Sequence, residues 1–180
     1  FGSPTTVMYR SDLLAKREPF YSESSVHEDT ELCYETMAEA DLGFVHQVLS
    51  FSRVGNDGNL TTIESFFWTL LDNYLSLQKF GRQFLSEDEF ARRMGPMRSE
   101  YLRILGESFL LGREGEFWDY HRKGLATIGE RLPTRWDLTP QIARAALKAV
   151  ARPRWFWRER SRFKSVVAGA TNGARAHGGK

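Results

Sequence analysis

Apolar side chains recur at helical spacing from residue 63 onward, and this periodicity constrains the fold more than any other feature of the chain. The stripe follows the i, i+3, i+4 rule and consists of Ile63, Phe66, Phe67, Leu70, Leu71, Tyr74 and Leu75. A stripe of this kind predicts an amphipathic helix with one face turned toward a core. Residues 60–151 are therefore expected to form a helical region.

Further helices in this region are marked by signals at their ends. Ser86 and Glu89 have the spacing of a capping box, and the helix that they begin is expected to kink at Pro96. Another helix is predicted over about residues 115–125. The last is predicted over about residues 139–151, because it opens with Thr-Pro and Pro is favoured at the first helical position.

The first 59 residues have a different pattern. Residues 4–10 and 42–53 are rich in β-branched and aromatic side chains, which is typical of strands. Between them, a short helix is predicted over residues 12–17 and a longer one over residues 28–40, with acids in its first turn. The order strand, helix, helix, strand predicts an α/β fold for this part of the chain.

This first part resembles the acceptor-binding half of a family 2 glycosyltransferase with the GT-A fold. The resemblance lies in FGSPTTVMYR at residues 1–10, in EDTEL at residues 28–32 and in the apolar run that follows. It implies the C-terminal part of a GT-A (Rossmann-like) mixed sheet over residues 1–59, followed by a mainly α-helical extension over residues 60–151. Because the chain starts in strand-like sequence, we expect a fragment that lacks the N-terminal nucleotide-binding half.

The resemblance also implies an activity and its residues. The reaction would be inverting transfer of a sugar from a nucleotide-sugar donor to a hydroxyl of a glycan or lipid-linked acceptor, with Asp29 as the general base. Substrate contacts are implied for Gly2, Ser3, Pro4, Glu28, His46 and Arg53. The first three would form a backbone wall beside the transferred sugar, Glu28 would bind the acceptor sugar, and the last two would reach the diphosphate. The fragment alone is expected to be inactive.

A divalent metal, Mg or Mn, is expected in the complete enzyme, bound mainly by residues upstream of this chain. The Asp-x-Asp motif that holds the metal in GT-A enzymes does not occur in residues 1–180. The four histidines share no metal-ligand spacing either. No residue of this chain is therefore predicted to be a metal ligand.

The same residues also have plainer structural interpretations. Glu28, Asp29 and Glu31 are typical of a helix start, where acids interact favourably with the helix dipole. His46 is equally an ordinary strand residue with a hydrogen-bonded ring, and Arg53 a solvated charge at a strand end. Spacing alone favours the structural interpretation of the acids, whereas the resemblance favours the catalytic one.

The charge of the chain is concentrated at its end. Residues 152–180 carry 8 Lys and Arg against one acid, and the rest of the chain is net acidic. Residues 152–164 alternate cations with aromatic rings, a composition that suits an anionic membrane surface, single-stranded nucleic acid or a helix docked on its neighbours. No nucleic-acid-binding motif accompanies the segment, so the membrane surface is ranked first and no nucleic acid is expected as a partner. The residues beyond 164 are expected to be a disordered tail.

An alternative function is a non-enzymatic helical adaptor, tethered by this basic segment to a membrane surface or to nucleic acid. The single cysteine, Cys33, excludes an internal disulfide, and its apolar neighbours predict a buried side chain. No apolar run of about 18 residues is present. We therefore expect a cytoplasmic location, peripheral at the inner face of the membrane.

Overall fold

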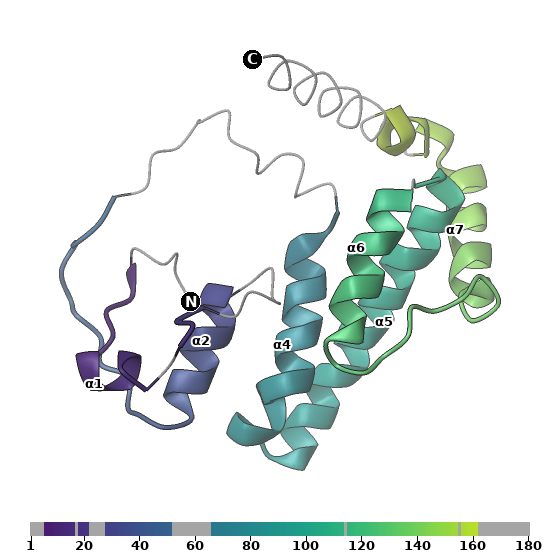
Figure 1. The fold of residues 1–180 in the computed structure, drawn as a ribbon. Coiled ribbons are helices and arrows are strands. Elements are labelled where there is room, and N and C mark those ends of the chain that lie inside the picture. Colours follow the sequence, from purple (N-terminus) through teal and green to yellow (C-terminus); the bar gives the residue numbers. More distant parts are fainter. Residues whose placement is uncertain are drawn as a thin grey trace, which may run out of the picture.

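The computed structural model describes residues 6–16, 18–21, 28–51, 66–113, 115–154 and 156–161. Within these ranges it contains helices and no strand, which points to an all-α fold. Helix α4 is central, with α2 on one side and α5 and α6 on the other, and α7 packs against α5 (Figure 1). The helices are α1 (Ser11–Leu14), α2 (Glu28–Met37), α4 (Trp68–Phe84), α5 (Glu87–Leu111), α6 (Gly115–Ala126) and α7 (Thr139–Ala151).

The prediction of an α/β fold with a mixed GT-A sheet is wrong for the described residues. Residues 7–10 and 41–51, which have strand-like sequences, adopt no regular secondary structure. Composition gives a segment a preference for the extended state, but a strand also needs a neighbour for its backbone hydrogen bonds. Among the described residues neither segment has such a neighbour. The apolar side chains of residues 41–51 stay in solvent, with Phe44 79% and Phe51 92% exposed.

Helix α4 begins later than the apolar stripe predicts. Phe67 has a left-handed backbone (φ 54°) and is the N-cap of α4, so Phe66 and Phe67 form a turn that precedes the helix. Both rings still pack against the core. The stripe therefore predicted burial correctly at these positions, although it did not predict the helix boundary.

Helix α5 starts with the predicted capping box. The Oγ of Ser86 accepts a hydrogen bond from the backbone N–H of Glu89 (3.4 Å), and the Glu89 carboxylate accepts one from the backbone N–H of Ser86 (3.0 Å). The helix continues through Pro96 to Leu111, where Gly112 ends it in a left-handed conformation (φ 70°).

Helices α6 and α7 occupy the predicted ranges, although Thr139 is the first residue of α7 and not its cap. The core lies among α4, α5, α6 and the turn before α7, and its buried residues are Leu71, Tyr74, Tyr101, Leu105, Phe117, Leu125 and Leu138. Tyr74 and Tyr101 stack with their ring centroids 5.0 Å apart. Among the described helices, none is both long and apolar enough to cross a membrane.

Candidate functional site at the start of helix α2

Helix α2 begins with the two acids that the sequence singles out. Asp29 lies in the first turn, where the unpaired backbone N–H groups favour a negative charge. Its Oδ1 accepts a hydrogen bond from the backbone N–H of Thr30 (2.8 Å), which fixes the carboxylate. The other oxygen, Oδ2, makes no hydrogen bond with any residue that the structure describes.

Tyr9 connects the N-terminal segment to α2. Its hydroxyl lies 3.1 Å from the Sγ of Cys33, which is buried as predicted. Burial, followed by the contact with Cys33, raises the pKa of Tyr9 above its usual range, and the charges of Tyr21 and Asp29 raise it further. Tyr9 is therefore a neutral hydroxyl near neutral pH, and it lies close enough to Asp29 to respond to its charge.

A cavity of about 480 Å³ lies beside Tyr9 and Cys33, between the N-terminal segment, α1 and the end of α2. This volume lies within the range of small-molecule sites. Polar side chains that suit the hydroxyl groups of a sugar line part of it: Arg10, Asp12, Lys16 and Thr36. From α2 the cavity is lined by Cys33, Thr36 and Met37, in the C-terminal half of the helix, and Asp29 is not among its described lining residues.

Asp72 on α4 is the most perturbed carboxyl of this region. Burial raises its pKa to about 6, and the negative charges of Asp29 and Glu31 contribute to the rise, while a hydrogen bond with Ser76 opposes it. Glu31 is itself neutralised in part by Lys79, whose Nζ lies 2.6 Å from its Oε1. The contact between α2 and α4 therefore brings several carboxyls together, and one of them changes its protonation state near neutral pH.

The resemblance places the expected Mg or Mn mainly on residues upstream of this chain, and these carboxyls are no substitute for that site. Within the part of the chain that the structure describes, no group of three metal-ligating side chains forms. The ammonium of Lys79 occupies a position beside Glu31, and burial raises the pKa of Asp72 to about 6. The metal expected in the complete enzyme stays a prediction.

The structure tests the predicted site residues unequally. Gly2, Ser3, Pro4 and Arg53 lie outside the described residues. Glu28 and Asp29 are brought together as the first two residues of α2. His46 lies in the exposed segment 41–51. Its ring packs against the ring of Phe44 in the same segment, with the ring centroids 4.9 Å apart, and no contact with a described residue of α2 is seen.

Sequence reasoning missed Tyr9, Asp72 and Lys79 as neighbours of the acids. Lys79 and Asp72 lie beside the apolar stripe of α4, at positions that a sequence pattern assigns to a solvated helix face. The contact between α2 and α4 changes their surroundings, because Tyr34 stacks on Phe80 with centroids 5.2 Å apart. An aromatic residue on each helix is the only signal in the sequence, and it does not specify the pairing.

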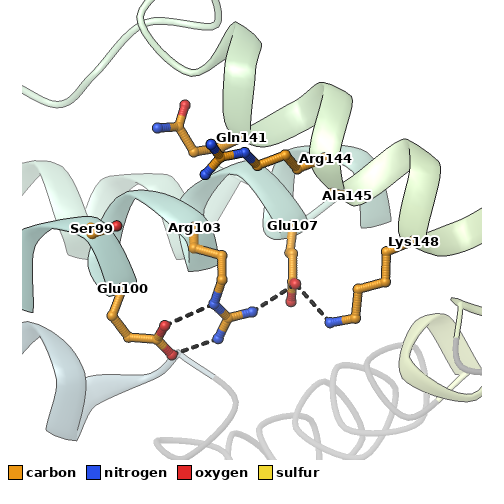
Figure 2. A pocket seen from close by; sticks show the side chains of 8 residues that line it. All are labelled: Ser99, Glu100, Arg103, Glu107, Gln141, Arg144, Ala145 and Lys148. Carbon is orange, nitrogen blue, oxygen red and sulfur yellow. Dashed lines mark hydrogen bonds and ion pairs between the residues drawn. The ribbon is translucent and has the colours of Figure 1, made fainter. Parts of the chain in front are cut away.

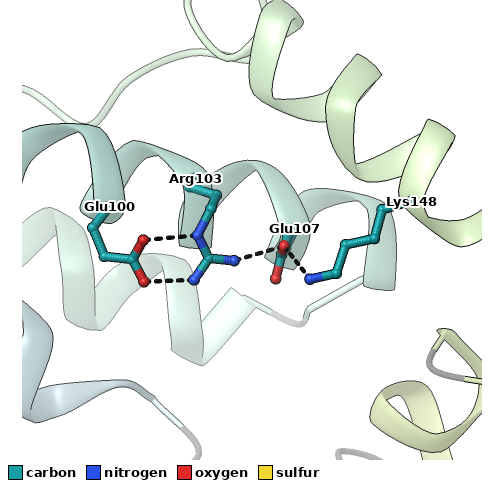
Figure 3. A network of polar contacts seen from close by, with 4 residues as sticks. All are labelled: Glu100, Arg103, Glu107 and Lys148. Carbon is teal, nitrogen blue, oxygen red and sulfur yellow. Dashed lines mark hydrogen bonds and ion pairs between the residues drawn. The ribbon is translucent and has the colours of Figure 1, made fainter. Parts of the chain in front are cut away.

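A second cavity, of about 230 Å³, lies between α5 and α7 (Figure 2). Four of its charged side chains, those of Glu100, Arg103, Glu107 and Lys148, form a continuous ladder along one side (Figure 3), and the charged side chain of Arg144 also lines the cavity (Figure 2). Arg103 contacts Glu100 through two hydrogen bonds (2.8 and 2.5 Å) and Glu107 through one (2.6 Å), and Lys148 contacts the same Oε1 of Glu107 (2.8 Å).

This ladder joins the two helices and does not form a ligand site. The hydrogen bonds to Glu100 raise the pKa of Arg103 above its usual range, and Arg103 lowers the pKa of Glu100, so both remain charged near neutral pH. The contact of Lys148 with Glu107 links α7 to α5. Since each charge of the ladder has an opposite charge within it, we interpret the cavity as part of the helix packing.

No protein-family model, no curated protein and no solved structure matches the chain.

Proposed function

We propose that this chain serves in transfer of a sugar from a nucleotide-sugar to a hydroxyl acceptor, with Asp29 as the general base. The observation that carries the proposal is the position of Asp29, fixed by one oxygen at the start of α2 and free of described hydrogen bonds at the other. The proposal does not depend on a sheet. It depends on the sequence order around Asp29 and on the polar cavity beside Tyr9.

The chemistry requires one proton acceptor from this chain. As the acceptor oxygen bonds to the anomeric carbon of the donor, its proton passes to Oδ2 of Asp29. The bond between the anomeric carbon and the diphosphate oxygen breaks, and the electron pair leaves with the nucleoside diphosphate. A positioned carboxylate typically accelerates such a step by about 10²–10⁴-fold.

The neighbours of Asp29 support this role. Asp29 lies at the N-terminal end of α2, beside the backbone N–H groups of its first turn. Asp72, whose pKa is raised to about 6, reduces the negative charge of the region when it is protonated. The hydroxyl of Tyr9 stays protonated and is able to donate a hydrogen bond to a ligand in the cavity.

The test is an acceptor-dependent transfer assay on the whole open reading frame that encodes the chain. A panel of UDP-, GDP- and dTDP-sugars is incubated with glycan and lipid-linked acceptors, and nucleoside diphosphate release is measured. The proposal predicts release that requires both an acceptor and a donor, with inversion at the anomeric carbon in the NMR spectrum of the product. Absence of release across the panel, from a folded protein, would contradict the proposal.

A second candidate function is the non-enzymatic helical adaptor. It is favoured by the hydrophobic core, whose buried residues come from α4, α5, α6 and the turn before α7 and which Ile142 of α7 packs against. A core of this kind gives a rigid body for presenting surfaces to a partner. The adaptor predicts no nucleoside diphosphate release with any donor, so the same assay separates the two functions.

A further inference from the structure

The outer side of helix α7 is apolar although it faces solvent. Leu147 and Val150 lie three residues apart, on one side of the helix, and are 71% and 82% exposed. The opposite side carries Ala145, which is buried, and it packs against α5. Exposed aliphatic side chains on one helix side, next to a concentration of charge, are typical of an interaction surface.

The residues that follow α7 extend this surface with cations and an aromatic ring. Arg152 and Arg154 are exposed, and no ion pair is described for either. In the short helical stretch 156–161, Trp157 is 62% exposed. Trp157 and Arg158 of this stretch are therefore exposed to solvent, as are Leu147 and Val150 of α7.

The acid of this stretch faces the protein. Glu159 has a side chain that is 28% exposed. Burial lowers the pKa of Arg113, two residues after α5, to about 10, and the charge of Glu159 opposes this shift. Arg158 lies beside it, with its Nε 3.3 Å from the Glu159 carboxylate. The negative charge is thus turned inward, and the outward side keeps its positive charge.

We propose that Leu147, Val150, Arg152, Arg154 and Trp157 form a docking face for an anionic lipid bilayer. Aliphatic side chains enter the acyl boundary, Trp favours the interface, and arginines attract anionic headgroups. A second copy of the chain would place like charges opposite one another. Single-stranded nucleic acid would use the ring and the cations but leave Leu147 and Val150 without a role. The face contains no residue of the Asp29 site, so it is independent of the proposed glycosyl transfer.

The test is sedimentation of the full chain with vesicles of phosphatidylcholine and phosphatidylglycerol, compared with vesicles of phosphatidylcholine alone. Binding is expected only with the anionic vesicles and is expected to weaken at high salt. The double substitution Arg152→Gln/Arg154→Gln is expected to reduce binding about 30-fold, from the contribution of each arginine near such a surface. Leu147→Asp/Val150→Asp is expected to abolish it. Because these side chains are exposed, circular dichroism spectra should be unchanged.

The matched control is Arg92→Gln/Arg93→Gln, which removes the same charge from exposed positions on α5. The proposal requires the affinity of this control for the anionic vesicles to lie within a few-fold of that of the unsubstituted chain. Equal losses for both arginine pairs would reduce the effect to net charge and overturn the proposal. Binding of a single-stranded oligonucleotide in place of vesicles, or a dimer that Leu147→Asp/Val150→Asp dissociates with vesicle binding unchanged, would overturn it as well.

Discussion

Acidification should destabilise the helical core through one buried side chain, His121. Its Nε2 lies 3.0 Å from the backbone oxygen of Phe66, and its Nδ1 lies 2.9 Å from the hydroxyl of Tyr101. A carbonyl only accepts hydrogen bonds, so Nε2 carries the hydrogen and Nδ1 accepts from Tyr101. The imidazole with this bond is neutral, and a second proton on Nδ1 would require the hydroxyl of Tyr101 to turn and accept the bond that it now donates.

The magnitude follows from the shift in the pKa. Burial lowers the pKa of His121 from 6.5 to about 4, and the charge of Arg113 adds to this, while the bond to Phe66 opposes it. Because the folded-state pKa is lowered, the contribution to stability is complete above pH 6.5. It is lost as the pH falls toward 4 and amounts to about 3 kcal/mol in total. A loss of this size is a large fraction of the stability of a typical domain.

The assay is urea unfolding followed by far-UV circular dichroism between pH 7.5 and pH 4, for the unsubstituted chain and for His121→Gln. Glutamine keeps one donor and one acceptor but does not titrate. The variant should be less stable at pH 7.5. The difference in the free energy of unfolding between the two proteins should be smaller by about 3 kcal/mol at pH 4 than at pH 7.5. Carboxyl titrations, including that of Asp72, are common to both proteins and cancel. A difference that stays constant with pH, or an NMR pKa of His121 near 6.5, would refute the reasoning.

Two substitutions test the packing around the site and the core. Asp72→Asn should stabilise the protein at pH 7.5 by about 1–2 kcal/mol, after allowance for the partial exposure of Asp72, and should have little effect below pH 4. The reason is that a carboxyl with a raised pKa destabilises the fold only once it ionises. An equal change in the free energy of unfolding at both pH values, measured by urea unfolding, would contradict the raised pKa of Asp72. Gly106→Ala should destabilise by about 1–3 kcal/mol, because its Cβ would lie 2.5 Å from the Cβ of Gln141 on α7. Gly115→Ala, whose Cβ meets nothing within 4 Å, is its control and should unfold at nearly the same urea concentration.

The helices were predictable because their signals are local. The stripe of α4, the capping box of Ser86 and Glu89, and the Thr-Pro start of α7 each depend on residues within a few positions of one another. The strands failed for the opposite reason. Residues 41–51 have a strand-like composition, but a strand depends on a distant partner that local composition does not specify.

The candidate site likewise has one part that local sequence predicts and another that only the packing of distant segments determines. The position of Asp29 in a first helical turn could be predicted from the acids themselves. Its proximity to Tyr9 and Asp72 could not, because it results from the packing of α2 against the N-terminal segment and α4. The raised pKa of Asp72 is a consequence of that packing, since burial is its first cause.

The most direct test of the central claim is the turnover of Asp29→Asn in the complete reading frame, with the donor and acceptor that support release. Asparagine keeps the shape of the side chain and accepts the hydrogen bond from Thr30, but it cannot take the acceptor proton. Glu31→Gln is the matched control, because it removes the same charge in the same helical turn along with the Lys79 ion pair. We predict that kcat falls by about 100-fold or more for Asp29→Asn, with donor affinity and Tm nearly unchanged, and by less than about tenfold for Glu31→Gln. Normal turnover of Asp29→Asn, or an equal loss in both variants, would contradict the claim that Asp29 is the base.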